Sequence, residues 1–358
     1  MIKTKPILLL LIFFVHLSAQ ADFYTHRLEN YSVTEKTWRL SPSLNYYDTD
    51  SNFDNSSTQF NPSPLQKYNR INTEILIAYG ISDKFTPFAR LNWSYVKMRD
   101  LSTQTSTFGF GDQTFGLNYA LIREPNKKGV EWTLQAQVDF PGYNNLSAGA
   151  NTPPLGDGSR DITLATFLDW PLGNNPNNPI TIAHFGVGIT DRSKDFSSAI
   201  PWHVGIEINP APTGIFFGAS TFGVVSLQTD PRSTVKTAGG SLAMGSFVYD
   251  ARNPTLAHLR LDLGHHAASY ELGAHLTGGI LGTNAPKGIT TGVYFNFYFN
   301  RSKNAEPSTD PTKIDPNEYE YSNRGAIEYG YDCKVTGLND QLNMVRINKG
   351  RLGRVTNS

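Results

Sequence analysis

The sequence predicts an all-β protein: a transmembrane antiparallel β-barrel of about 12 strands with a C-terminal periplasmic tail. Three observations predict this fold. Apolar and polar residues alternate over many successive stretches, the connections between these stretches alternate between short and long, and aromatic residues gather where the stretches end. The composition and the individual elements agree with it.

The composition excludes several other classes of protein. The chain has 358 residues, of which 39% are apolar and 17% charged, and its mean hydropathy is −0.35. A bundle of transmembrane helices needs several apolar runs of about 20 residues, which this sequence lacks. Lys and Arg total 31, and so do Asp and Glu, so no basic field for binding nucleic acid is expected. The 21 Phe, 17 Tyr and 5 Trp favour a folded chain over a disordered one.

Residues 1–21 have the pattern of a cleaved secretory signal peptide. Two lysines precede an apolar run over 7–17, and Ala-Gln-Ala at 19–21 supplies the small residues of a cleavage site. Cleavage there leaves 29 basic against 31 acidic residues. Residues 22–37 are then expected to form an N-terminal periplasmic segment. Cys333 is the only cysteine, so no intrachain disulfide is expected.

About twelve stretches have the period of two that is typical of strands with two different faces. The most regular is 130–140, where apolar residues alternate with residues that form hydrogen bonds or carry charge. In order, the predicted strands are 38–48, 69–81, the stretch that begins at Ala89, 113–121, 130–140, and about 160–170, 180–190, 200–209, 214–227, 255–264, 268–281 and 288–299.

The lengths of these strands and of their connections favour a membrane barrel over a soluble β-sandwich. Strands of globular sheets usually have about 5 to 6 residues, whereas tilted membrane strands need about 9 to 11. Short connections are expected at 82–84, near 125–126, at 174–179 and at 210–212, and long ones at 49–66, 141–158 and 228–254. Tight turns at one rim and extended loops at the other are typical of outer-membrane barrels.

Aromatic residues are expected to form girdles at the strand ends, and a closed barrel leaves no open edge in lipid. The candidates are Tyr79, Phe85, Phe88, Phe140 and Trp170. Because the strand number is even, both ends of the barrel domain, 38–299, are expected on the periplasmic side.

The last predicted strand resembles the assembly signal of bacterial outer-membrane proteins. Its residues 290–297, Thr-Thr-Gly-Val-Tyr-Phe-Asn-Phe, place a polar residue, a glycine and two aromatic residues at the positions of that signal. The matching residues are Thr290, Gly292, Phe295 and Phe297. The resemblance implies that outer-membrane lipid and the barrel assembly machinery are partners of this chain.

Two further segments resemble the barrel family named for the meta pathway of phenol degradation. Residues 108–119, Phe-Gly-Phe-Gly-Asp-Gln-Thr-Phe-Gly-Leu-Asn-Tyr, are similar to its glycine-glycine-aspartate strand start. Residues 140–142 and 155–161 are similar to its strand, Pro-Gly loop and Gly-Ser-x-Asp return. The resemblance covers roughly 38–299 and implies an outer-membrane, channel-like protein associated with uptake of hydrophobic or aromatic compounds. One departure is that the chain continues for 59 residues, 300–358, beyond the last strand.

Strand parity places an acidic set of side chains inside the predicted barrel. The candidate lumen-lining residues are Arg70, Glu74, Arg90, Asp112, Glu131, Asp139, Asp161, Asp169, Glu207, Arg260, Asp262 and Glu271, with His184, His203 and His275 as titratable additions. A ring of like charge would favour cations. The alternative is that arginines pair with neighbouring carboxylates and that these pairs fill the interior.

The glycine-rich segments allow two interpretations each. Gly109 and Gly111 beside Asp112 could bind an anion through backbone amides, but a bulge at the start of a strand is preferred. Residues 156–159 look superficially like a calcium loop, yet EF-hand spacing is missing, which favours a plain hairpin loop.

No catalytic, cofactor or metal site is expected. His265, His266 and Ser269 are the one neighbouring His and Ser set, and they fall near a predicted short turn. The tail divides into a linker rich in Pro, Asp, Thr and Asn at 303–316 and a mildly amphipathic piece beyond it. Docking to a periplasmic partner and a poorly ordered extension are both open for 300–358.

These observations predict a monomeric outer-membrane channel-like protein for passive uptake of a small molecule. The first alternative is a non-conducting barrel that binds a ligand or partner through the loops 49–66 and 228–254 and is tethered by its tail. The second is a secreted soluble β-sandwich.

Overall fold

The computed structural model describes residues 27–54, 56–60, 67–100, 103–123, 130–142, 155, 159–172, 181–193, 196–209, 214–228, 236–237, 248–250, 253, 255–267, 269–283 and 285–300. The expected signal peptide and the tail beyond residue 300 lie outside these ranges. Within them, no helix is long and apolar enough to cross a membrane.

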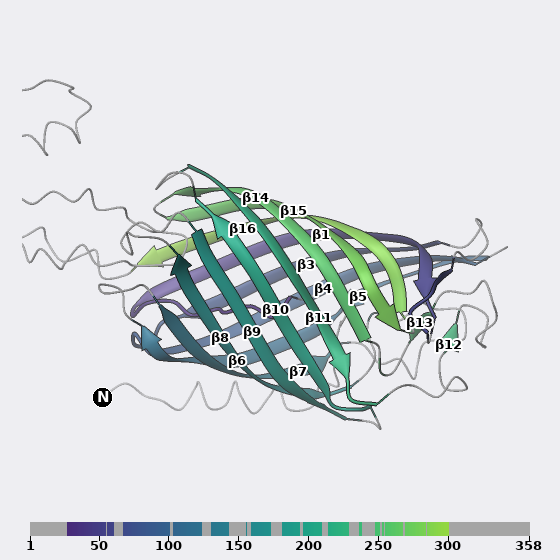
Figure 1. Ribbon diagram of the computed structural model, residues 1–358, viewed down its shortest axis with the longest axis horizontal. Helices are drawn as coiled ribbons and strands as arrows, with labels where there is room; N and C mark the ends of the chain where they lie inside the picture. Colours follow the sequence, from purple (N-terminus) through teal and green to yellow (C-terminus); the bar gives the residue numbers. More distant parts are fainter. Residues whose placement is uncertain are drawn as a thin grey trace, which may run out of the picture.

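Long, tilted strands wrap around a common axis and form the wall of the molecule (Figure 1). In chain order the strands are β1 (Thr37–Phe53), β2 (Gln59–Phe60), β3 (Lys67–Tyr79), β4 (Phe85–Asp100), β5 (Thr103–Phe110), β6 (Asp112–Arg123), β7 (Glu131–Pro141), β8 (Asp161–Leu172), β9 (Thr181–Arg192), β10 (Ala199–Ile208), β11 (Gly214–Ser226), β12 (Lys236–Thr237), β13 (Val248–Asp250), β14 (Thr255–Ala267), β15 (Tyr270–Thr283) and β16 (Ala285–Asn300).

The main sheet closes on itself as an antiparallel barrel. Sequential neighbours pair around the sheet, and β1 then pairs with β16 from Thr37 opposite Asn300 to Phe53 opposite Ala285. The sheet has 14 strands, but β2 is a two-residue addition to β1, and β5 and β6 both pair with β4 as parts of one long strand. The wall therefore has 12 strands, as the sequence predicts.

Gly111 separates β5 from β6 at a β-bulge. Trp93 of β4 lies opposite Phe110, whereas Arg90 lies opposite Thr114, so β5 and β6 contain one residue more than β4 over this interval. A Cβ atom on Gly111 would lie 3.1 Å from Cγ of Asn92. The close approach explains a glycine here and agrees with the bulge expected at this motif.

The two faces of the wall differ as the period of two predicts. Large apolar side chains face outward, as with Leu261 and Leu263 of β14, which are 51% and 54% exposed. On the same strand His258 and Arg260 point inward and are buried. The wall thus separates an apolar outer surface from a polar interior, which we call the lumen.

Two details of the prediction were wrong. The connections do not alternate strictly in length, because the connection between β15 and β16 is residue 284 alone and that between β9 and β10 is 193–198. Phe88 does not belong to an outer girdle. It is 5% exposed and packs inside with Leu76, since it shares its parity with the inward Arg90.

We call the rim with the connections 80–84, 209–213 and 268–269 the short-turn end, and the rim with the connections 142–160 and 227–254 the long-loop end.

Candidate functional site: the lumen and its two closures

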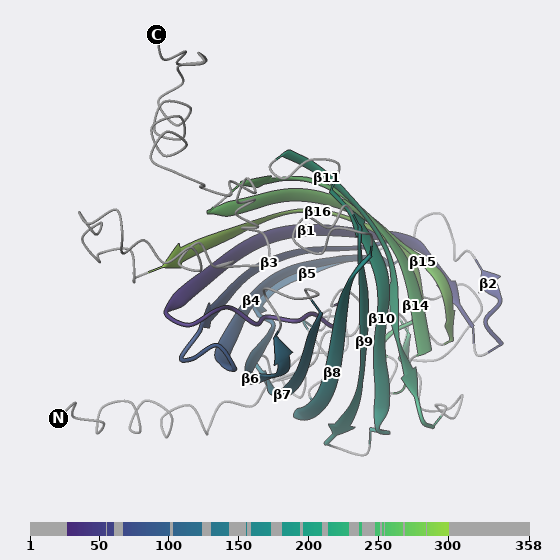
Figure 2. The same cartoon turned by 60° about the vertical axis from the view of Figure 1, so that its left-hand side comes forward.

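The segment 27–36, which we call the strap, lies inside the barrel and crosses the lumen. Its trace passes across the interior from the start of β1 (Figure 2). Val33 contacts Thr86 of β4, and at the far end Arg27 lies 3.9 Å from Asp262 of β14. The sequence predicts a periplasmic segment for 22–37. The structure places residues 27–36 of that segment in the interior that the barrel wall encloses.

The base of the strap is clamped to the short-turn end. The backbone amide of Lys36 donates to the carbonyl of Gly80, and the amide of Glu35 donates to the carboxylate of Asp83. Arg123 donates to the carbonyls of both Val33 and Asp83. A Cβ atom on Gly80 would lie 1.9 Å from the carbonyl oxygen of Thr34, so only glycine fits at this contact.

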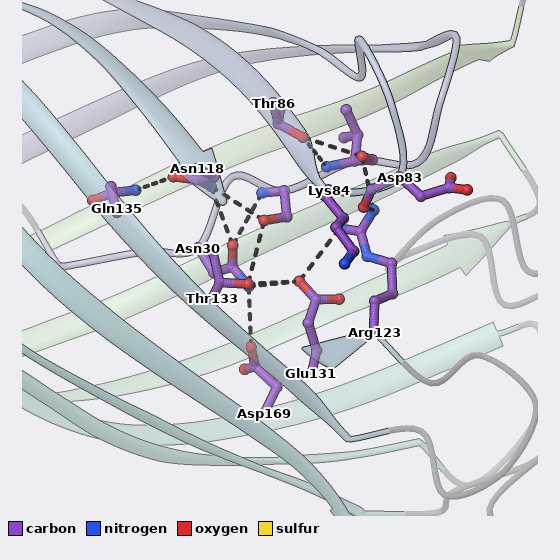
Figure 3. A network of polar contacts seen from close by, with 12 residues as sticks. Asn30, Asp83, Lys84, Thr86, Asn118, Arg123, Glu131, Thr133, Gln135 and Asp169 are labelled. Atoms are coloured by element: carbon purple, nitrogen blue, oxygen red, sulfur yellow. Dashed lines mark hydrogen bonds and ion pairs between the residues drawn. The ribbon is translucent and has the colours of Figure 1, made fainter. Parts of the chain in front are cut away.

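The side chain of Asn30 is the centre of a polar network between the strap and the wall (Figure 3). Its Nδ2 donates to Oε1 of Glu131 at 2.9 Å and to Oδ2 of Asp169 at 3.2 Å. Nδ2 also lies 3.4 Å from Oγ1 of Thr133, and the side-chain amide of Asn118 lies 3.2 Å from Oδ1 of Asn30. Hydrogen bonds to charged partners are stronger than neutral ones, so this amide holds the strap firmly.

Tyr31 follows Asn30 and is 4% exposed. Its ring packs on Phe88 with centroids 4.7 Å apart, and Leu76 and Ala78 complete the apolar surroundings. Nη1 of Arg90 lies 3.5 Å from the hydroxyl oxygen, at the limit of a hydrogen bond. Burial raises the pKa of Tyr31 well above its ordinary value, so the hydroxyl stays protonated.

The tip of the strap carries an ion pair in the middle of the lumen. Nη2 of Arg27 lies 2.8 Å from Oε1 of Glu29. Burial by itself would raise the pKa of Glu29, but the guanidinium groups of Arg27, Arg260 and Arg39 lower it to about 2. Glu29 is therefore ionised at every physiological pH. Its attraction to the arginines, and that of Arg27 to Asp262, hold this part of the strap.

A second closure lies toward the long-loop end. Leu155, from the connection 142–160, is fully buried against Tyr47, Tyr68 and Val96. Nη2 of Arg70 donates to its carbonyl oxygen at 2.9 Å. Among the described residues of this connection, Leu155 places an apolar side chain in the lumen.

Inward side chains at the long-loop end are more apolar than those around the strap. Ala199, Val224, Leu256 and Ala285 form a second buried cluster at that end. The apolar clusters give this part of the interior a surface on which apolar groups can pack.

All twelve predicted lumen-lining residues lie on the inward face of their strands, and many are paired. Arg90 lies 3.8 Å from Glu74 and 3.7 Å from Asp139. Arg260 donates to both oxygens of Asp262 at 2.6 to 2.9 Å. Asp169 lies against His184. The remaining predicted residues are placed as follows: Arg70, Asp112 and Asp161 are buried, Glu131 contacts the strap, and Glu207 and Glu271 lie at 3.4 and 3.7 Å from His266. Whether these residues line a conducting path stays a prediction.

Sequence reasoning missed several inward residues. Arg39 lies over the ring of Tyr31, with Cζ 5.8 Å from its centroid, and Arg192 lies 3.6 Å from Asp161. Extending the parity of 38–48 and of the strand near 180–190 finds both arginines. The positions of Asn30, Tyr31 and Leu155 depend on contacts with distant strands, and no periodicity marks them.

The other candidate residues do not form a reactive centre. His265 faces outward and stacks with Tyr270, whereas His266 faces inward, so strand parity separates the two histidines. Among the described residues, no group of three or more His, Cys, Asp or Glu side chains is arranged to hold a metal ion. Of the expected assembly-signal residues, Thr290 points inward and Phe295 outward on β16, and Gly292 and Phe297 lie on the same strand. Recognition of these residues by the assembly machinery stays a prediction.

No protein-family model and no curated protein matches this chain. Among solved structures it is similar to the COG4313 outer membrane channel from Pseudomonas putida F1, with a TM-score of 0.57 and 13% identity over 76% of this chain and 100% of that one. It is also similar to the CymD monoaromatic hydrocarbon channel (TM-score 0.39, 8% identity, 75% of this chain and 90% of that one) and to the NanC porin (0.41, 9%, 72% and 98%).

At these identities the likeness concerns the fold alone, which is that of a closed antiparallel β-barrel. The family named for the meta pathway of phenol degradation stays a prediction. By their names, these three structures are two channels and a porin.

Proposed function

We propose that this protein is a monomeric outer-membrane channel that lets a small, partly apolar molecule cross the membrane by diffusion, with the strap as its main constriction. The observation that carries the proposal is the contrast between the two faces of the closed wall. Exposed Leu, Ile, Val and Phe side chains suit lipid, and an interior of hydrogen-bonding and charged side chains suits a solute path.

The proposed orientation places the short-turn end in the periplasm and the long-loop end outside the cell. Strand β1 begins and strand β16 ends at the short-turn end, where Thr37 pairs with Asn300. Outer-membrane barrels have their short turns on the periplasmic side. A periplasmic position for residues 300–358 follows from this orientation.

An apolar or aromatic solute is supported by the order of surfaces along the path. A molecule that enters at the long-loop end meets the clusters around Tyr47 and Leu256 before the polar network of the strap. Apolar groups are retained by such surfaces, whereas a strongly hydrated ion is not.

A second candidate is a non-conducting barrel that binds a ligand or partner through its loops. The strap and the paired interior charges favour it, because together they fill much of the lumen with satisfied groups.

Current through planar lipid bilayers separates the two candidates. A Cys333→Ser background that also carries Ser32→Cys and Thr133→Cys can lock the strap, since the two native hydroxyl oxygens are 3.5 Å apart. We expect little current with the disulfide formed, more current after reduction, and a preference for cations. Equal absence of current in both states, with the barrel intact, would favour the non-conducting candidate, and a preference for anions would contradict the acidic path.

A further inference from the structure

The outer surface of the wall carries a group of basic residues at the long-loop end of β3 and β4. These residues are Lys67 of β3 and Lys97 and Arg99 of β4, and we call them the basic cluster. All three have the parity of outward residues, because their chain neighbours Tyr68 and Met98 are buried. Lys67 and Arg99 are exposed, and Lys97 is half-buried.

The other basic side chains on the described strands of the main sheet are directed elsewhere. Lys287 contacts Gln59 of β2 and lies over the ring of Phe53. The arginines of these strands are buried or contact the strap, and they are Arg39, Arg70, Arg90, Arg123, Arg192 and Arg260. Outward basic charge is therefore gathered over two adjacent strands of the wall.

The basic cluster lies directly beyond a row of outward aromatic residues. The register places Tyr46, Ile71, Tyr95 and Phe108 side by side on β1, β3, β4 and β5 (Figure 1). The three aromatic residues are 45%, 37% and 73% exposed. Lys97 follows Tyr95 by two residues, or about 7 Å along the strand. Outward aromatic residues mark the boundary between hydrocarbon and headgroups, so the basic cluster lies at the depth of the lipid headgroups.

Two of the cations face each other across the strand pair. Lys67 pairs with Arg99, and Lys97 pairs with Asn69. Like charges on directly opposite residues destabilise a sheet. Among the described residues, no carboxylate pairs with these three cations, and Asp48, which is outward beside Asn69, accepts a hydrogen bond from the amide of Asn69. An anion bound between the cations would remove the repulsion.

Hydrogen-bonding side chains adjoin the cations on β5. Gln104 lies opposite Arg99, Ser106 lies opposite Lys97, and both are exposed. The outward carboxylates of β1 lie on the far side of β3. An arginine fork binds phosphate through two parallel hydrogen bonds, and a lysine adds a point charge. Amide and hydroxyl groups beside such a site suit the hydroxyl groups of a sugar.

We infer that the basic cluster binds the phosphate groups of lipid A, the phosphorylated disaccharide that anchors lipopolysaccharide in the outer leaflet. The inference rests on the proposed function for the orientation that places the long-loop end outside the cell. The outer leaflet then offers phosphate joined to sugar at the depth of the cluster. The acyl chains of the same molecule pass over the aromatic row toward the apolar part of the wall.

The test uses full-length protein in a neutral detergent and measures bound diphosphoryl lipid A by native mass spectrometry. Each basic residue near an anionic membrane surface contributes about a fivefold gain in affinity. We expect the triple variant Lys67→Gln, Lys97→Gln, Arg99→Gln to bind at least about tenfold more weakly than the unaltered protein. Arg99→Lys keeps the charge and should retain more affinity than Arg99→Gln.

The matched control is Arg160→Gln. Arg160 is exposed at the same rim, directly before β8, which lies three strands away from β4. This variant removes one positive charge without touching the basic cluster, so its affinity for lipid A should equal that of the unaltered protein. Heat-modifiable migration checks that each variant keeps a folded barrel.

The facing charges allow a second measurement with a change of sign. In neutral detergent, Lys67→Gln should raise the unfolding temperature, because it removes the repulsion from Arg99. With diphosphoryl lipid A present, the same variant should unfold at a lower temperature than the unaltered protein, because it binds the ligand less tightly. A gain of stability under both conditions would overturn the inference.

Three further outcomes would overturn it as well. They are equal affinity of the triple variant and the unaltered protein for diphosphoryl lipid A, equal binding of dephosphorylated lipid A, and equal binding of phosphatidylglycerol. Selective binding of lipid A by a protein that carries no current would support the lipid site and count against the proposed transport alone. Conduction without selective binding would count against the lipid site alone.

Discussion

The lumen is closed in two different ways at its two ends. Around the short-turn end, the strap is held by many polar contacts spread over 27–36, from Glu35 at the rim to Arg27 near Asp262. Toward the long-loop end, Leu155 fills an apolar cluster and its carbonyl accepts a hydrogen bond from Arg70. Among the described residues, the strap is thus held at many points and the second closure through Leu155, so we expect a single substitution to weaken the second closure more than the first.

Removal of the whole strap should have the largest effect. We expect replacement of 27–33 by Gly and Ser to raise the single-channel current above that of every single-residue variant, because it removes all the contacts between the strap and the wall at once. Exchange of the outward Leu261 and Leu263 of β14 for isoleucine, on the face of the wall away from the lumen, should leave the current unchanged. The contrast between the closures fails if a point variant in the strap gives the same current as the replacement.

Leu155→Ala should release the closure at the long-loop end. Truncation of a buried leucine costs about 2 to 5 kcal/mol, and the cost here falls on one loop contact. In a Cys333→Ser background with Val96→Cys, we expect the cysteine to react with a water-soluble maleimide faster by a factor of about ten for each 1.4 kcal/mol lost. Leu227→Ala, which truncates a 55% exposed leucine, is the control. An unchanged labelling rate would show that Leu155 does not close this end.

Asn30→Ala should loosen the strap without freeing it. Loss of its hydrogen bonds to Glu131 and Asp169 leaves two carboxylates short of a donor, at a cost of about 1 to 3 kcal/mol. We expect faster amide hydrogen exchange over 28–33 and only a small rise in current. Asn30→Asp has the same shape but adds a charge of the same sign as Glu131 and Asp169, so it should loosen the strap further. If amide exchange over 28–33 is no faster in Asn30→Asp than in the unaltered protein, the network is not electrostatic.

Of these four changes, a small change of pH near 7 should have the smallest effect on the current. Because the pKa of Glu29 is lowered from its ordinary 4.5 to about 2, its charge stabilises the seated strap fully above about pH 4.5, and this contribution is lost as the pH falls toward 2. We expect Glu29→Gln to remove that component. The difference in current between the two proteins should thus be constant at neutral pH and vanish near pH 2; a difference that changes between pH 6 and 8 would contradict it.

The wall of the barrel could be predicted from sequence because each strand carries its own evidence. A period of two fixes which residues face inward, as with Arg260 and Asp262 against Leu261 and Leu263 of β14. Closure then follows from the need to pair every strand edge in lipid. The same rule also finds Arg39, once the parity of the first strand is extended to it.

The two closures could not be predicted, since neither has a local signal. Asn30 meets Asp169, which is 139 residues away, and Leu155 meets Arg70, which is 85 residues away. Irregular segments bury residues according to distant partners, and no periodicity records that choice. The exact register and the bulge after Phe110 likewise depend on the neighbouring strands.

The base of the strap has a backbone conformation that depends on the neighbouring turn. Lys36 has a φ of 60°, in the left-handed region that non-glycine residues rarely adopt, and its amide bonds to Gly80 in the neighbouring turn. A side chain at position 80 would push the backbone of Thr34 aside. The turn at the rim therefore sets the angle at which the strap enters the barrel, although it lies apart from the contacts of Asn30 and Arg27.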